Sequence, residues 1–68
     1  MIKKISTRDY IRNVETLKKH GYEVRPLMSH RRKDFYLSVD VYNMYENKFL
    51  GNFSTPRNAL DFFHDIIY

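Results

Sequence analysis

The chain has 68 residues, a formal net charge of +4 and no cysteine. A chain of this length supports one small hydrophobic core, and without cysteine that core has no help from disulfides or thiolate-bound metals. We therefore expect a single domain over residues 1–68, in a reducing and cytoplasmic compartment. No apolar run approaches the roughly 20 residues that span a bilayer, and no apolar signal segment follows the first five residues.

The charge is divided unevenly between the two halves of the chain. Residues 1–33 carry ten lysine and arginine residues against three acidic ones, a net +7. Residues 34–68 carry two basic residues against five acidic ones, a net −3. This asymmetry favours an acidic partner for the first half, such as a nucleic-acid backbone.

A first helix is predicted over about residues 7–20, with Ser6 or Thr7 as its N-cap and Gly21 at its left-handed end. One face of this helix is apolar, with Tyr10, Ile11, Val14 and Leu17. The opposite face is charged, with Arg8, Arg12, Glu15 and Lys19.

Three strands are predicted next, over about residues 22–27, 35–42 and 48–53. Pro26 cannot donate a ladder hydrogen bond, so the first strand is expected to lie at an edge of the sheet or to end there. The loop that follows it contains His30, Arg31, Arg32 and Lys33. Alternation in the second and third strands predicts a core-facing set of Phe35, Leu37, Val39, Val41, Phe49, Gly51 and Phe53. The opposite, open face is then expected to present Arg25, Tyr36, Ser38, Asp40, Tyr42, Lys48, Leu50 and Asn52.

A second helix is predicted over about residues 56–67, with Thr55 as its N-cap and Pro56 as its first residue. Its wide apolar stripe is expected to pack on the sheet and comprises Ala59, Leu60, Phe62, Phe63, Ile66 and Ile67. The fold class is therefore α+β: an α-β-β-β-α two-layer sandwich, in which both helices cover one face of a three-stranded antiparallel sheet.

The junction between the last strand and the second helix resembles the AP2-like group and the related three-stranded DNA-binding domains of integrases. Leu50-Gly51-Asn52-Phe53-Ser54-Thr55, followed by Ala59, is similar to the Leu-Gly-x-Phe-x-Thr stretch and helical alanine of that group. The resemblance covers roughly residues 22–63. It implies a DNA-binding domain that uses the open sheet face.

A weaker resemblance is to the double-stranded-RNA-binding domain, which has the same α-β-β-β-α order. Tyr22-Glu23-Val24, then His30 before Phe35, then Val39 and Val41 are similar to the first two strands of that family. The second helix here opens Pro56-Arg57-Asn58-Ala59-Leu60, with one cation where that family has a lysine-rich run. We therefore favour DNA over RNA as the partner.

The function predicted from these patterns is a small, non-enzymatic nucleic-acid-binding protein. Its expected contact residues lie in the basic loop, on the open sheet face and on the first helix: Arg8, Arg12, Arg25, His30, Arg31, Arg32, Lys33, Tyr36, Tyr42 and Lys48. An alternative is a phage-type interaction or inhibitor domain that binds a host protein. It would use exposed aromatic residues, Tyr36, Tyr42 and Tyr45, or an acidic patch of Asp40, Glu46, Asp61 and Asp65. The three histidines are dispersed and no nucleophile motif is present, so we expect no metal, no cofactor and no catalysis.

Overall fold

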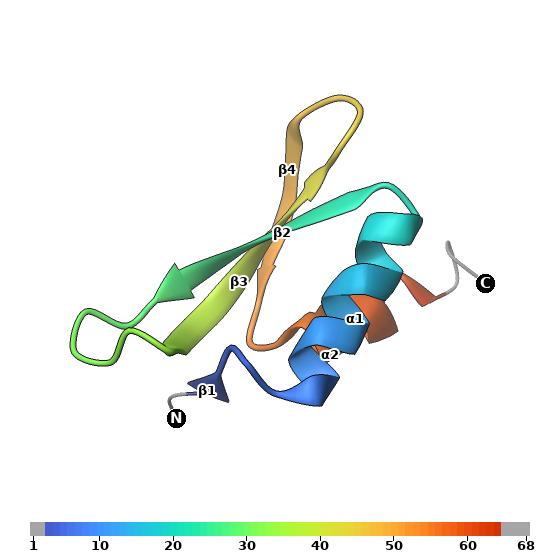
Figure 1. The fold of residues 1–68 in the computed structure, drawn as a ribbon. Coiled ribbons are helices and arrows are strands. Elements are labelled where there is room, and N and C mark those ends of the chain that lie inside the picture. The colour runs from blue at the N-terminus through green and yellow to red at the C-terminus, as the bar shows by residue number, and fades with distance from the viewer. Residues whose placement is uncertain (1–2, 65–68) are drawn as a thin grey trace.

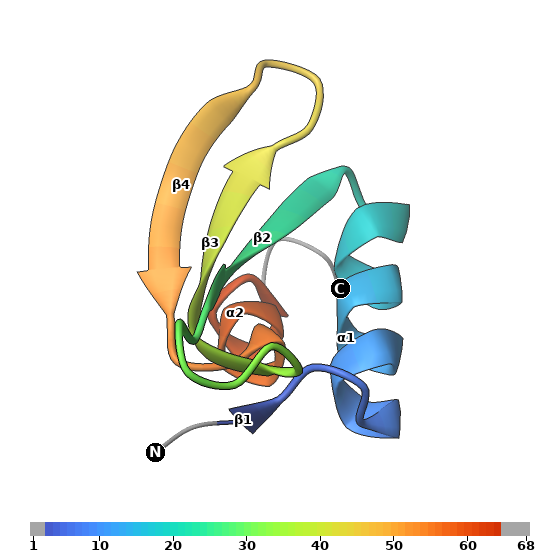
Figure 2. The same ribbon diagram turned by 60° about the vertical axis from the view of Figure 1, so that its left-hand side comes forward.

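The computed structural model describes residues 3–64, which form an antiparallel sheet with two helices on one face (Figures 1 and 2). The elements are β1 (Lys3–Lys4), α1 (Arg8–Lys19), β2 (Tyr22–Met28), β3 (Phe35–Asn43), β4 (Lys48–Phe53) and α2 (Pro56–Phe62). The predicted α+β class with an antiparallel sheet is confirmed. The expected number of strands is wrong, because this part of the chain contains four strands and not three.

β3 is the central strand, and every other strand pairs with it in antiparallel fashion. β2 occupies one edge of β3 from Tyr36 to Asn43. β4 takes the other edge opposite residues 39–43, and β1 continues along that edge opposite Phe35 and Tyr36. The two residues of β1 were not predicted as a strand, since so short a segment has no alternation to recognise.

Both helices begin at the threonines predicted to cap them. The Thr7 side chain accepts a hydrogen bond from the Tyr10 amide at 3.3 Å, and that of Thr55 accepts one from the Asn58 amide at 3.1 Å. Gly21 follows α1 with a φ of +91°, a backbone conformation that favours glycine. A side chain at this position would also meet the Tyr45 ring, 2.6 Å from the Cβ position.

The core lies between the helices and the covered face of the sheet. Its buried members are Tyr10, Leu17, Tyr36, Val39, Val41, Ala59 and Phe63. Aromatic contacts extend this core, because Tyr22 stacks on Phe63 with ring centroids 4.7 Å apart and Phe53 meets Phe63 at 5.7 Å. The aromatic residues thus account for much of the packing between layers.

A β-bulge in β3 reverses the predicted positions of Tyr36 and Leu37. Leu27 pairs with Ser38 and Met28 pairs with Tyr36, so Leu37 is an extra residue in β3. Tyr36 is therefore buried at 3% exposure, with its ring 5.0 Å from that of Tyr10, whereas Leu37 is 49% exposed. The expected open-face position of Tyr36 and core position of Leu37 are both wrong, because one extra residue switches the side chains to opposite faces.

A second bulge in β4 moves Phe49 out of the core. Val41 pairs with Gly51 and Tyr42 with Phe49, so Leu50 is the extra residue here. Phe49 is 53% exposed and its ring meets the Tyr42 ring edge-on at 5.4 Å, while Leu50 is half-buried against the core. The predicted core position of Phe49 and open-face position of Leu50 are wrong for the same reason as in β3.

The helices bury narrower faces than their apolar patterns predict. Ile11 in α1 is 48% exposed and Phe62 in α2 is 70% exposed. Each helix lies against the sheet and the other helix only along part of its circumference (Figure 2), so the margin of a wide apolar stripe stays outside the contact. Ile66, Ile67 and the predicted helix end near residue 67 lie outside the described residues.

Candidate nucleic-acid interface

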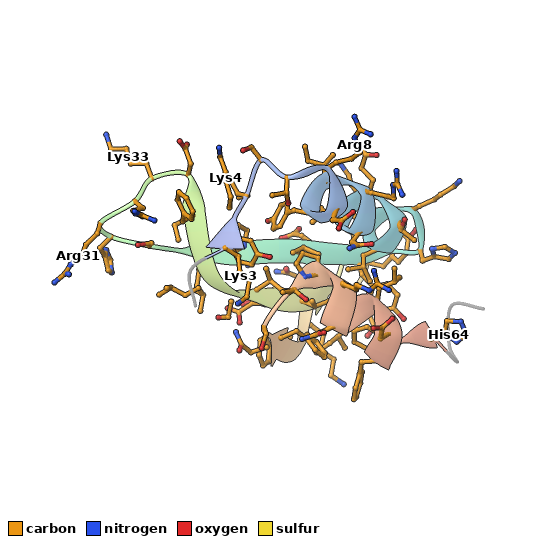
Figure 3. All side chains as sticks on the ribbon, turned by 90° about the horizontal axis from the view of Figure 1, so that it is seen from below. Lys3, Lys4, Arg8, Arg31, Lys33 and His64 are labelled. Carbon is orange, nitrogen blue, oxygen red and sulfur yellow. The ribbon has the colours of Figure 1, made fainter. Side chains whose placement is uncertain are left out.

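Two segments far apart in the sequence bring five cations to one end of the molecule. β1 pairs with the start of β3, and the Ile5 amide donates a hydrogen bond to the Asp34 carbonyl at 2.8 Å. This pairing places β1 beside the loop that joins β2 to β3 (Figures 1 and 3). We call the resulting cluster the cationic tip; it comprises Lys3, Lys4, Arg31, Arg32 and Lys33.

Hydrogen bonds of the backbone and of the Ser29 side chain hold the loop of the cationic tip in a defined shape. The Ser29 hydroxyl accepts from the amides of Arg31 and Arg32, both at 3.3 Å. The Ser29 amide donates to the Phe35 carbonyl at 2.9 Å, and the Phe35 amide donates to the Arg32 carbonyl at 3.2 Å. The arginines are therefore presented from an ordered turn.

Two of the five cations are engaged within the protein. Lys3 donates from Nζ to the Leu37 carbonyl at 3.2 Å and lies 5.6 Å from the centre of the Tyr36 ring. The Arg32 guanidinium lies over the Phe35 ring at 4.9 Å. Both contacts hold a cation in place without neutralising its charge, because the partners are a carbonyl and an aromatic ring and not a carboxylate.

Three cations of the tip are exposed and have no side-chain partner among residues 3–64: Lys4, Arg31 and Lys33. The Glu23–Arg25 pair, on the sheet, is the salt bridge found within these residues. The loop holds one nearby carboxylate, Asp34, so the tip keeps a clear excess of positive charge. His30 is exposed in the same loop.

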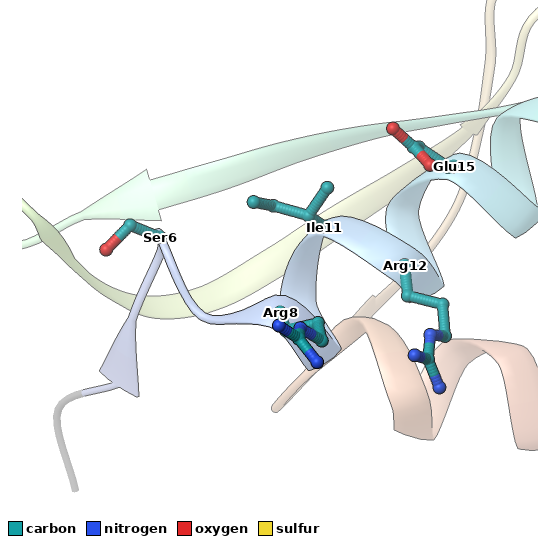
Figure 4. Close-up of a pocket in the computed structure, with 5 residues that line it drawn as sticks. All are labelled: Ser6, Arg8, Ile11, Arg12 and Glu15. Carbon is teal, nitrogen blue, oxygen red and sulfur yellow. The ribbon is translucent and has the colours of Figure 1, made fainter.

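The cationic tip continues toward the first turn of α1. In Figure 3 the side chains of Lys33, Lys4 and Arg8 project on the same side of the molecule. Arg8 and Arg12 border a shallow depression on α1 (Figure 4), which Ser6, Ile11 and Glu15 complete. The two helix arginines are exposed and extend the basic surface beyond the tip.

Arg25 is held on the open sheet face by its neighbours. Its guanidinium lies 4.1 Å from the centre of the Tyr42 ring, forms the ion pair with Glu23 and donates to the Asn47 side-chain oxygen at 3.2 Å. The hydrogen bond to Glu23 is the main cause that raises the pKa of Arg25. The Tyr42 ring is correspondingly covered on the side where Arg25 lies.

The rest of the open sheet face is close to charge balance. The Asn52 amide donates to Asp40 at 2.8 Å and to Ser38 at 3.0 Å, which fixes a carboxylate near the middle of the face. Lys48 pairs with Asn43, one residue beyond the Tyr42–Phe49 pair, so alternation places it on the other face of the sheet, at the end of β3 far from the tip, and its predicted open-face position is wrong. This face should therefore attract phosphates less strongly than the cationic tip does.

The structure thus separates the predicted contact residues. His30, Arg31, Arg32 and Lys33 lie in the loop between β2 and β3, Arg8 and Arg12 lie on α1, Arg25 and Tyr42 lie on the open face, and Lys48 lies at the start of β4. Tyr36 belongs to the core. Sequence reasoning missed Lys3 and Lys4, because only their pairing with residues 35 and 36 connects them to the loop.

Comparisons of the chain with known proteins give no match, whether against protein-family models, curated proteins or solved structures. The resemblances to AP2-like and double-stranded-RNA-binding domains therefore stay predictions. Residues 3–64 contain no helix long and apolar enough to span a membrane. Within the same range, no three histidine or acidic side chains converge as metal ligands would.

Proposed function

We propose that the protein is a small nucleic-acid-binding domain without catalytic activity, and that it grips the phosphate backbone of duplex DNA with the cationic tip. The observation that carries this proposal is the meeting of β1 with the β2–β3 loop, which gathers five cations at one end of the sheet. Three of them have no partner within the described chain. Exposed cations held by ordered backbone are suited to neutralise phosphates.

The proposal favours a duplex over a single strand because the two tyrosines that were predicted to contact nucleic acid, Tyr36 and Tyr42, are poorly placed to stack on bases. Single-strand recognition relies on open aromatic faces. Tyr36 is 3% exposed and Tyr42 is covered on one side by Arg25. Phosphate contact, in contrast, needs only the charges of the tip and of the adjoining α1 residues Arg8 and Arg12.

DNA is favoured over RNA by the opening of α2. Arg57 is the single cation in its first turn, and Asp61 follows on the exposed side. This pattern lacks the lysine run that the double-stranded-RNA-binding resemblance requires. The AP2-like junction at residues 50–55 points to DNA instead.

The test is fluorescence anisotropy of a labelled DNA duplex at about 50 and about 200 mM salt, with a matched RNA duplex as competitor. The tip variant replaces Lys4, Arg31 and Lys33 with alanine. The control variant replaces three exposed cations elsewhere, Lys18, Lys19 and Arg57, and so has the same net charge.

We expect micromolar or tighter binding by the wild type, and a salt slope that falls by about three units in the tip variant. The control variant and Arg25→Ala should change this slope much less. Equal losses in the tip and control variants would show that net charge alone attracts the duplex. Absence of binding at the lower salt concentration would refute the proposal.

A protein partner is the second proposed function, and one observation favours it. Phe49, Phe62 and Tyr45 are 53%, 70% and 84% exposed, which is unusual for large side chains that could pack. The proposed acidic patch is a weaker basis, because Asp40 is hydrogen-bonded to Asn52 and Asp65 lies outside the described residues. A nuclease-treated pull-down that yields no stoichiometric partner would count against this function.

A further inference from the structure

Two leucines are exposed next to the cationic tip. Leu27 is 46% exposed and Leu37 is 49% exposed, and they are neighbours across the bulge where two residues of β3 oppose one of β2. Regular alternation would bury Leu37 beside Val39. The bulge therefore exposes to solvent an apolar side chain that the sequence pattern predicts to be buried.

The backbone of Leu37 is in direct contact with one cation of the tip. The Leu37 carbonyl accepts the hydrogen bond from Lys3 Nζ at 3.2 Å. Two residues earlier, the Phe35 ring supports the Arg32 guanidinium at 4.9 Å. One cation from β1 and one from the loop are thus held at Leu37 and at its near neighbour Phe35.

An apolar site flanked by cations is complementary to a nucleic-acid groove, where sugars and bases form the floor and phosphates form the rims. We propose that Leu27 and Leu37 act as a wedge against a base step of the bound duplex, while the cationic tip holds the phosphates on either side. The wedge partly unstacks that step and bends the DNA.

This inference rests on the proposed function and adds a property of the target. Unstacking is easiest at pyrimidine–purine steps such as TA, whereas A-tracts are stiff. The protein should therefore discriminate between duplexes by their deformability. It needs no hydrogen bond to a base edge to do so.

An anionic lipid surface also combines phosphates with apolar material. Insertion into a bilayer scales with the apolar area that is buried, and two leucines on a hydrogen-bonded ribbon offer little. The narrow wedge fits a single base step better. Vesicles of phosphatidylserine are therefore included in the test as a competitor.

The experiment measures binding and end-to-end fluorescence energy transfer in two short DNA duplexes, one with a central TA step and one with a central A-tract. The wedge variant is Leu27→Ser with Leu37→Ser, and a second variant, Leu27→Met with Leu37→Met, keeps the apolar character. Phe49→Ser is the matched control, because Phe49 in β4 is similarly exposed but pairs with Tyr42, at the end of β3 far from the tip. Circular dichroism checks that each variant folds.

We expect the wild type to bend the TA duplex and to bind it about tenfold more tightly than the A-tract duplex, in line with the discrimination typical of one altered step. The serine variant should lose both the bend and the preference while it keeps the salt slope. The methionine variant and Phe49→Ser should behave like the wild type.

Retention of the bend and the preference by the serine variant would overturn the wedge and leave duplex binding intact. The same holds if the wild type binds both duplexes equally and bends neither. Failure of the wild type to bind either duplex, or its removal from DNA by phosphatidylserine vesicles, would overturn the proposed function together with the wedge.

Discussion

Replacing Tyr36 should destabilise the protein far more than replacing Leu37, which is the opposite of what alternation in the sequence predicts. Tyr36→Ala removes a side chain that is 3% exposed and in contact with Tyr10. Loss of a buried aromatic side chain costs about 3–4 kcal/mol, of which the ring pair supplies about 1 kcal/mol. Leu37→Ala removes a side chain that is 49% exposed. Its loss should cost about 1 kcal/mol or less.

Urea denaturation followed by circular dichroism measures both free energies of unfolding. A domain of this size has a total stability of only a few kcal/mol, so Tyr36→Ala is expected to be largely unfolded in water. Tyr36→Leu keeps part of the apolar volume and gives a measurable midpoint below that of the wild type. If Leu37→Ala proved as destabilising as Tyr36→Leu or more so, the bulge in β3 would be wrong, and the proposed wedge with it.

Two further predictions concern the turn after α1 and the buried tyrosines. Gly21→Ala should cost about 1–2 kcal/mol, because its φ of +91° disfavours any side chain. Since Tyr45 is 84% exposed and its ring can move aside, adding Tyr45→Ala should recover less than about 0.5 kcal/mol in a double-mutant cycle; a larger recovery would mean that the ring contact dominates. Burial raises the pKa of Tyr10, with a smaller contribution from Tyr36, and burial also raises the pKa of Tyr36. The unfolded chain therefore loses these protons at a lower pH than the folded protein does. The contribution of the two tyrosines to stability is fully present below the ordinary tyrosine pKa of about 10 and is lost as the pH rises above it. Tyr10→Phe with Tyr36→Phe should flatten this loss in urea titrations at increasing pH, and an equally steep loss in that variant would contradict the assignment.

Local signals in the sequence were sufficient for the start of both helices, for the end of α1 and for the fold class. Thr7 and Thr55 cap their helices because a side-chain oxygen satisfies an amide in the first turn, an interaction that depends on residues three positions apart. Gly21 was recognisable since left-handed backbone favours glycine. Alternation also placed Val39, Val41 and Phe53 correctly against the helices.

Only one part of the candidate interface, the basic loop, was predictable from the sequence. The loop cations from Arg31 to Lys33 stand together in the sequence, so a basic cluster was evident from composition. The wrong predictions for Tyr36 and Phe49 have a common cause. Each follows from a bulge that adds one residue to a strand, and no local sequence pattern predicts that residue.

What the sequence determined by itself is therefore the set of local choices: caps, turns, the strand-forming runs and the basic character of the first half. Tertiary structure decided which faces those strands present and which charges meet. Lys3 and Lys4 join the loop only through pairing with β3, more than thirty residues away in the chain. Strand register and long-range pairing depend on contacts between distant segments, such as Tyr10 with Tyr36, and those contacts exist only once the chain has folded.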